Sequence, residues 1–293
     1  MPDYYCYLFN QKDSEYTLNH LSRDDIFKSL QKEEHEQPTI GLYTVSGSES
    51  GLKSALYEKS LLHGFDYCLL PKSQSFGPFR LAVFDMDSTL IPIEVIDELA
   101  VQAGVGEEVS KITESAMRGE LDFNQSLEQR VRQLKGLSVE AINAVKNQLE
   151  FNPGVEAFCQ YFIRQSGKIA IASGGFMPFA EELARRLPFY QVKANRLIDA
   201  NGVLTGEVEY PIVNAAVKTE SLQEWASVLG FKAQQCIAVG DGANDLKMLQ
   251  EAGIGVAYKA KPTLGKLADC VLNVGYLNSL VDLLPLIEQR HRV

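Results

Sequence analysis

LAVFDMDSTL, residues 81–90, joins an apolar run of strand length to a group of small polar and acidic residues. A short, continuous apolar run is typical of a strand that is buried on both faces of a parallel sheet. Asp85 then lies at the carboxyl end of that strand, where open α/β sheets bind their ligands. By itself, the stretch could equally form a strand-end turn in which an aspartate caps the next helix.

Similar apolar runs recur downstream of this stretch. They are KIAIAS (168–173), CIAVGD (236–241), IGVAY (254–258) and CVLN (270–273). Segments with amphipathic helical spacing lie between them, including PGVEAFCQYFIRQ, PFAEELARRL and TESLQEWASVL. This alternation of buried strands and helices predicts an α/β fold built on a doubly wound parallel sheet.

The remaining segments predict how the chain is organised. Residues 1–72 show strand and helix patterns of a small α/β domain, and residues 73–79 have the proline, glycine and serine content of a linker. The main domain is then expected at 80–293. Residues 93–150 show helical patterns without strand runs, so we expect a helical cap inserted there. Residues 192–213 predict a hairpin that turns at Asn201-Gly202.

Polar residues follow three of the predicted strands, and the fold would bring these strand ends together. DMDST follows the first, SGGF the second and GDGAND the third, and a lysine opens a helix between the last two. The candidate site residues in these segments are Asp85, Asp87, Ser173, Gly174, Lys218, Asp241, Asn244 and Asp245.

These residue types suit the transfer of a phosphoryl group from a phosphate monoester. A carboxylate such as Asp85 is a usable nucleophile at neutral pH without activation. Asp87 can protonate the leaving alcohol and then deprotonate the attacking water. The Ser173 hydroxyl and the Gly174 N–H can hold phosphoryl oxygens, while Lys218 adds a fixed positive charge.

The same segments offer hard oxygen ligands for Mg²⁺, which we expect as the cofactor. Asp85, Asp241 and the backbone carbonyl of Asp87 are the candidate ligands. Asp245 is expected to orient those ligands, although it could instead cap a helix. Asn244 could hold a metal-bound water or the lysine.

The motifs DMDST, SGG, a lone lysine and GDGAND, in that order, resemble the four motifs of the haloacid dehalogenase superfamily. The resemblance covers about residues 80–290. It implies a Rossmann-like core and a phospho-aspartyl intermediate on Asp85. Asp87 resembles the residue found in the phosphatase members, whereas the ATP-driven pumps of the superfamily carry threonine there and also have membrane spans.

Within that superfamily, DMDSTLIPIEVIDELA and ITESAMRGELDFNQSLEQRVRQLKGL resemble the phosphoserine phosphatase family. By that resemblance Glu94 contacts the substrate ammonium group, Arg130 pairs with the substrate carboxylate, and Met117 and Phe123 close an apolar lid. Without the resemblance, Glu94 could be a first-turn acid and Arg130 a solvated charge, with Arg132 equally available. Met117 and Phe123 could simply pack within the cap.

Composition narrows the class of protein. Asp and Glu number 38 against 28 Lys and Arg, and the net charge of -10 disfavours nucleic acid and anionic membranes as partners. The five cysteines are widely spaced and form no CxxC, which favours neither a disulfide framework nor a zinc site. No apolar run approaches the roughly 20 residues of a membrane span, and the first residues lack a signal-peptide pattern. We therefore expect a cytoplasmic protein with a small-molecule substrate.

Three functions compete at this stage. The resemblance implies hydrolysis of O-phospho-L-serine to L-serine and phosphate, the last step of L-serine biosynthesis. The alternative is a related phosphatase or phosphotransferase that acts on another small phosphate ester. A binding protein without activity is disfavoured, because the nucleophile and the metal ligands are intact. Residues 1–72 are compatible with an ACT-like regulatory domain and equally with packing or dimerisation, so a homodimer stays open.

Overall fold

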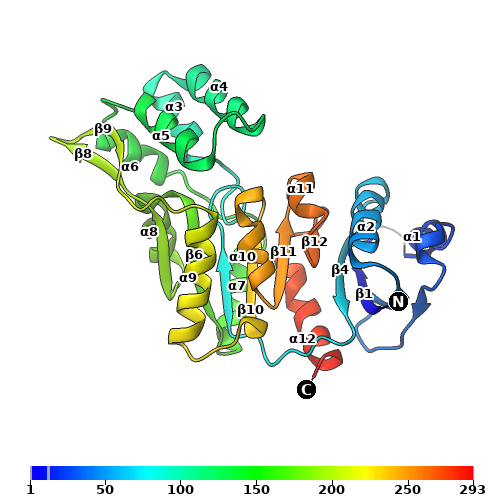
Figure 1. Ribbon diagram of the computed structural model, residues 1–293. Helices are drawn as coiled ribbons and strands as arrows, with labels where there is room; N and C mark the ends of the chain where they lie inside the picture. The colour runs from blue at the N-terminus through cyan, green and yellow to red at the C-terminus, as the bar shows by residue number, and fades with distance from the viewer. Residues whose placement is uncertain (1, 12–13, 293) are drawn as a thin grey trace.

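The structure is a computed structural model that describes residues 2–11 and 14–292. Ten strands form one sheet in the order β2-β3-β1-β4-β12-β11-β10-β5-β6-β7 (Figure 1). The larger part of it is parallel and consists of β5 (Leu81–Phe84), β6 (Lys168–Phe176), β7 (Gln191–Asn195), β10 (Cys236–Gly240), β11 (Ile254–Tyr258) and β12 (Cys270–Leu272). The predicted parallel α/β sheet is therefore confirmed.

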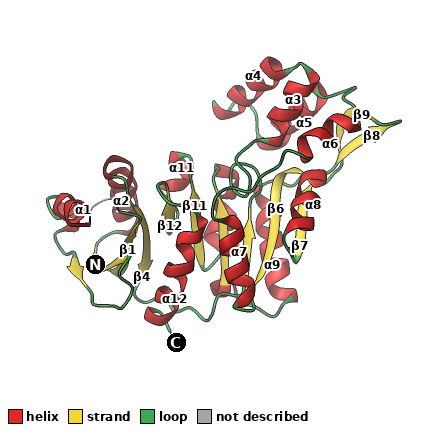
Figure 2. Ribbon diagram, turned by 180° about the vertical axis from the view of Figure 1, so that it is seen from behind, coloured by secondary structure: helices red, strands yellow, loops and turns green. Residues whose placement is uncertain are grey.

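Helices cover both faces of the parallel part (Figures 1 and 2). One face carries α7 (Val155–Arg164), α8 (Met177–Arg186) and α12 (Leu280–Arg290), and the other carries α9 (Ala215–Val228) and α10 (Leu246–Glu251). Because side chains alternate along a strand, the side chains of β5 pack into the hydrophobic clusters on both faces of the sheet. Ala82 and Phe84 join one cluster of buried residues, whereas Leu81 and Val83 join the other. This double burial explains the continuous apolar run at 81–84.

A group of helices stands over the carboxyl ends of the parallel strands (Figure 1). They are α3 (Val95–Ala103), α4 (Gly106–Met117), α5 (Phe123–Gln133) and α6 (Val139–Lys146). The start of α5 is set by a capping box, in which the side chains of Asp122 and Gln125 each accept a hydrogen bond from the other residue's backbone N–H. These helices cover the edge of the sheet where the candidate residues lie.

A two-stranded hairpin of β8 (Leu197–Ala200) and β9 (Val203–Val208) lies beside these helices. It turns at Asn201 and Gly202, as predicted, with φ values of 54° and 80°. Its first arm is shorter than predicted, because residues 191–195 pair with β6 and form the edge of the large sheet. The hairpin is also hydrogen-bonded to the α5–α6 loop, between Gly136 and Leu204 at 2.8 Å.

Residues 3–71 form an antiparallel extension of the same sheet. Its elements are β1 (Asp3–Phe9), α1 (Ser14–Leu21), β2 (Gln31–Lys32), β3 (Ile40–Ser46), α2 (Glu49–His63) and β4 (Asp66–Pro71). Strand β4 runs antiparallel to β12, with Cys68 opposite Cys270 and Tyr67 opposite Val271. A single sheet therefore runs through both halves of the chain.

Short elements complete the chain. They are α11 (Pro262–Gly265) and the 3-10 turns Asp25–Phe27, Ala233–Gln235, Ala243–Asp245 and Leu277–Ser279. Within the described residues, none of the helices combines the length and apolar character needed to cross a bilayer.

Candidate active site

Asp85 occupies the first position after β5, as the sequence predicts. Its backbone N–H donates to the carbonyl of Val239 on the neighbouring strand, at 2.9 Å, so the main chain at the strand end is held in register. Its Oδ1 atom accepts the N–H of Met86 at 2.7 Å. The second oxygen is directed at a lysine from another element.

That lysine is Lys218, which is fully buried on α9. Its Nζ lies 2.7 Å from Oδ2 of Asp85 and 2.7 Å from Oδ1 of Asp245. Burial acts to lower the pKa of Lys218, but Asp245 and Asp85 outweigh it and raise the pKa above its ordinary value. The side chain of Asn214 caps the start of α9 and so fixes where the lysine stands.

Asp241 completes a buried acidic cluster with Asp85 and Asp245, in which one carboxylate oxygen from each lies within 4.8 Å of the others. Burial, followed by the charges of Asp85 and Asp245, raises the pKa of Asp241 to about 8. Carboxylates crowded in this way suit a hard divalent cation, whose charge would remove the repulsion between them. The donor set therefore fits Mg²⁺.

Asp245 differs from the other two acids because its side chain holds the backbone of the loop that carries Asp241. Oδ1 accepts from Lys218, and Oδ2 accepts from the backbone N–H groups of Asp241 and Gly242 at 3.2 and 3.0 Å. Burial and the charge of Asp85 still raise the pKa of Asp245 to about 7. These bonds hold the loop after β10, in which Asn244 is half-buried.

Asp87 is almost completely buried, and its Oδ1 atom has no hydrogen-bond partner among the described residues. Burial, followed by the charges of Glu94 and Asp85, raises the pKa of Asp87 well above its ordinary range. This environment favours the protonated form of the Asp87 carboxyl group, which is the form that can act as an acid.

The SGG segment at the end of β6 borders the same site. Ser173 is fully buried, and its Oγ accepts the N–H of Gly175 at 2.9 Å. The side chain of Asn195 donates to the carbonyl of Gly174 and accepts the N–H of Val213, both at 2.8 Å. Sequence analysis did not select Asn195, because the strand that it ends, QVKAN, mixes polar and apolar residues and is not a continuous apolar run.

The structure brings Glu94 and Arg130 toward this site. Ser88 donates to Glu94 Oε1 at 2.7 Å, and burial, opposed by that hydrogen bond and aided by the charge of Asp85, raises the pKa of Glu94. Arg130, on α5, is half-buried, and burial lowers its pKa against the charges of Glu94, Asp97 and Asp87. Arg132 is exposed, so the two arginines that the sequence left open are not equivalent.

The two predicted lid residues are placed differently. Phe123 is half-buried, and its ring atom Cζ lies 2.7 Å from where a Cβ atom would stand at Gly174. Met117 ends α4 with 71% of its surface exposed. The structure thus places Phe123 against the SGG segment and leaves Met117 on the outside of the cap.

Lys261 is a further residue that sequence analysis missed. It follows β11, and its backbone N–H donates to the carbonyl of Asp241 at 3.0 Å. Its charge lowers the pKa values of Asp241 and Glu94, against the larger effect of their burial. The available signal was a lysine close behind a predicted buried strand.

The model of the haloacid dehalogenase-like hydrolases matches residues 79–253, which contain all of the candidate site residues except Lys261. The chain belongs to this family. A haloacid dehalogenase family hydrolase from Salmonella enterica serovar Typhi superimposes with a TM-score of 0.82 at 32% identity, covering 96% of this chain and 98% of that one. The resemblance drawn from the four motifs is therefore confirmed.

Two proteins named as phosphoserine phosphatases are also similar to this chain. A protein from Schizosaccharomyces pombe named probable phosphoserine phosphatase is 39% identical, over 94% of this chain and 92% of its own length. A structure described as a phospho-aspartyl intermediate analogue of phosphoserine phosphatase has a TM-score of 0.67 at 38% identity, covering 71% of this chain and 99% of that one.

Proposed function

We propose that this hydrolase converts O-phospho-L-serine to L-serine and phosphate through a phospho-aspartyl intermediate on Asp85. The observation that carries the proposal is the buried ion pair between Lys218 and Asp85, at 2.7 Å. It fixes a carboxylate at the end of a strand and supplies a positive charge where a phosphate dianion would approach. The names of the two similar phosphoserine phosphatases support the choice of substrate.

In the first step an oxygen of Asp85 attacks phosphorus, and the bond between phosphorus and the serine oxygen breaks. Asp87, whose protonated form is favoured by burial, gives its proton to the departing oxygen. In the second step a water attacks the phosphorus of the phospho-aspartyl group while Asp87 takes a proton from that water. The bond from phosphorus to Asp85 then breaks and releases phosphate.

Three groups would hold the phosphoryl oxygens during both steps. They are the Ser173 hydroxyl, the Gly174 N–H and the Lys218 ammonium group, whose positions are supported by their bonds to Gly175, Asn195 and Asp245. Asp85, Asp241 and the carbonyl of Asp87 would hold Mg²⁺, with Asp245 and Asn244 supporting their loop. When bound, the ion would neutralise negative charge at the phosphoryl group.

The amino-acid part of the substrate would lie beneath the cap. We assign its ammonium group to Glu94 and its carboxylate to Arg130, since both are partly buried and lie near the acids of the site. Phe123 would shield this space from water, whereas Met117 would reach it only after α4 moves, because its side chain is exposed.

A substrate panel tests this proposal. Phosphate release would be measured with Mg²⁺ for O-phospho-L-serine, phosphoethanolamine, which lacks the carboxylate, and phosphoglycolate, which lacks the ammonium group. We expect kcat/KM to be at least about tenfold lower for each of the two analogues, because one buried partner would be left unpaired. Equal values for all three would reject phosphoserine as the preferred substrate while leaving a phosphatase.

The setting of the reaction is part of the same proposal. We place it in the cytoplasm as the last step of L-serine biosynthesis, and the five free, buried cysteines support a reducing compartment. We also propose a division into an N-terminal domain at 1–72, a linker at 73–79 and a phosphatase domain at 80–293 with its cap at about 93–150. The β-α-β-β-α-β order of residues 3–71 supports an ACT-like assignment; a homodimer stays a prediction.

A further inference from the structure

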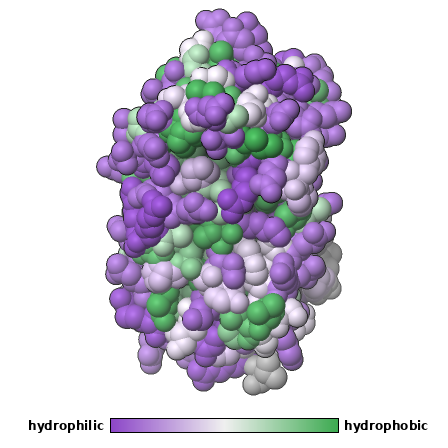
Figure 3. All heavy atoms as spheres, turned by 90° about the vertical axis from the view of Figure 1, so that its left-hand side faces the viewer, coloured by the Kyte–Doolittle hydropathy of each residue, from purple (hydrophilic) through white to green (hydrophobic). Residues whose placement is uncertain are grey.

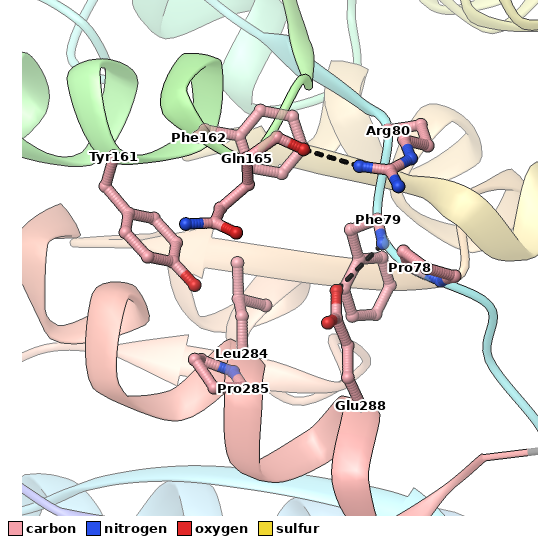
Figure 4. Close-up of a pocket in the computed structure, with 9 residues that line it drawn as sticks. All are labelled: Pro78, Phe79, Arg80, Tyr161, Phe162, Gln165, Leu284, Pro285 and Glu288. Carbon is pink, nitrogen blue, oxygen red and sulfur yellow. Dashed lines mark hydrogen bonds between the residues drawn. The ribbon is translucent and has the colours of Figure 1, made fainter.

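A cavity lies at the amino-terminal end of β5, at the other end of that strand from Asp85. It has a volume of about 460 Å³ and lies between the segment before β5, the end of α7 and helix α12 (Figure 4). Arg80, which lines it, directly precedes β5, whereas Asp85 directly follows that strand. The cavity is therefore separate from the catalytic site, and its volume falls in the range of small-ligand sites, about 300–1,000 Å³.

Two opposite charges border this cavity without pairing with each other. Arg80 donates through Nη1 to the carbonyl of Gln165, and one oxygen of Glu288 accepts the N–H of Phe79 at 2.9 Å (Figure 4). Within residues 2–11 and 14–292, neither charge takes part in an ion pair. The Nε and Nη2 atoms of Arg80 and the second oxygen of Glu288 are thus left for a ligand.

The rest of the lining combines polar tips with an apolar surface. The hydroxyl of Tyr161 and the side-chain amide of Gln165 are directed into the space that Figure 4 shows, and Leu284 and Pro285 lie below them. Burial raises the pKa of Tyr161, and the charges of Glu288 and Asp282 add to this increase. Hydrogen-bonding groups therefore converge beside an apolar wall.

We propose that this cavity binds a free amino acid with a small apolar side chain. Its carboxylate would pair with Arg80, its ammonium group with Glu288 and the hydroxyl of Tyr161, and its side chain would pack on Leu284 and Pro285. A simple anion would meet the charge of Glu288 and a simple cation that of Arg80, so a ligand that bears both charges fits best.

Calorimetric titration of the full-length enzyme with L-valine tests this proposal. Isobutylamine, which is valine without its carboxylate, and isovalerate, which is valine without its amino group, are the matched probes. We expect valine to bind at one site and each analogue to bind at least about tenfold more weakly, since each leaves one charge of the cavity unpaired. Absence of saturable binding by valine, or equal binding of the three probes, would overturn the proposal.

Variants then locate the site. Glu288→Gln keeps an oxygen to accept the Phe79 N–H and Arg80→Gln keeps a donor for Gln165, so each removes charge with little disturbance. We expect each to weaken valine binding at least about tenfold. Arg130→Gln, the control, alters the proposed substrate site and should leave valine binding unchanged. If only Arg130→Gln lost valine binding, valine would bind at the catalytic site, and the proposed site beside Arg80 and Glu288 would be refuted.

Discussion

Asp87 and Gly175 approach so closely that a Cβ atom at residue 175 would stand 2.5 Å from Oδ2 of Asp87. The same added atom would lie 3.2 Å from the Oγ of Ser173. Because any side chain at 175 must displace the proposed acid, glycine is required here for the position of a neighbouring group and not for a turn.

We therefore expect Gly175→Ala to lower kcat by about 10²-fold, the scale of loss caused by a displacement of about 1 Å at a reacting group. Steady-state phosphate release would measure it. Gly106→Ala is the matched control, because the nearest atom to an added Cβ there is 3.9 Å away at the start of α4. Similar activity of the two variants would show that Asp87 does not need its present position.

Asp85→Asn should lower kcat by about 10⁴-fold or more, since it removes the attacking oxygen while keeping the side-chain shape. The variant should remain folded, because Lys218 keeps its bond to Asp245. We further expect its melting temperature in EDTA to equal or exceed that of the wild type, since one charge leaves a crowded acidic cluster. Activity near the wild-type level would exclude Asp85 as the nucleophile.

Arg130→Gln should raise the KM for phosphoserine by about 10- to 100-fold, the cost of losing a charge-assisted hydrogen bond. Arg132→Gln makes the same chemical change two residues away, on an exposed side chain, and should have little effect. The two KM values, measured side by side, decide which arginine binds the substrate. An equal rise in both variants would point to the net charge of the cap and not to a specific contact.

The acidic cluster predicts how stability depends on pH. Asp241 and Asp245 have raised pKa values of about 8 and about 7 in the metal-free fold, whereas unfolded aspartates titrate near 4. The folded protein therefore holds more protons between about pH 4 and 8, so the free energy of unfolding falls as the pH rises through that window. At low pH both carboxyl groups are protonated in the folded and the unfolded protein, so they no longer destabilise the fold.

Mg²⁺ favours the deprotonated acids, so its stabilising effect should grow from about pH 5 to about pH 8. Urea unfolding at several pH values, with Mg²⁺ and with EDTA, measures the difference. Asp241→Asn should flatten the pH dependence in EDTA. If the difference in stability between Mg²⁺ and EDTA did not change with pH, the proposal that Mg²⁺ binds at this acidic cluster would be contradicted.

Replacement of Asp66, which lies outside the candidate active site, is expected to lower the stability of the fold substantially. It is fully buried at the start of β4 and accepts four hydrogen bonds of 2.7–2.8 Å, from Asn10 and from the backbone N–H groups of 273–275. We expect Asp66→Ala to lower the free energy of unfolding by about 3 kcal/mol or more, because buried donors lose their acceptor. Asp3→Ala, which removes an exposed acceptor of the Ser46 hydroxyl, should cost less than about 1 kcal/mol. Similar losses of stability in Asp66→Ala and Asp3→Ala would contradict the role of Asp66 as a buried hydrogen-bond acceptor.

The parallel sheet and the main acidic residues were predictable because double burial leaves continuous apolar runs and strand ends carry the polar groups. The sequence pattern of the edge strand at 191–195 was less distinct. The strand is partly exposed, so its sequence resembles one arm of a hairpin. Asn195 acts through the backbone of Gly174, and such a bond leaves no pattern in a sequence. Lys261 bonds to the backbone of Asp241, and only its place behind a predicted buried strand could have indicated it. The exposure of Met117 likewise depends on how α4 packs.

The pairing of β4 with β12 has a consequence for work on fragments of this chain. If residues 1–72 were removed, the hydrogen-bonding edge of β12 would be uncovered, together with the apolar side chains that β4 shields. An open edge of that kind recruits strands from other molecules. A truncated catalytic half would therefore tend to aggregate, even though the residues proposed for chemistry all lie within it.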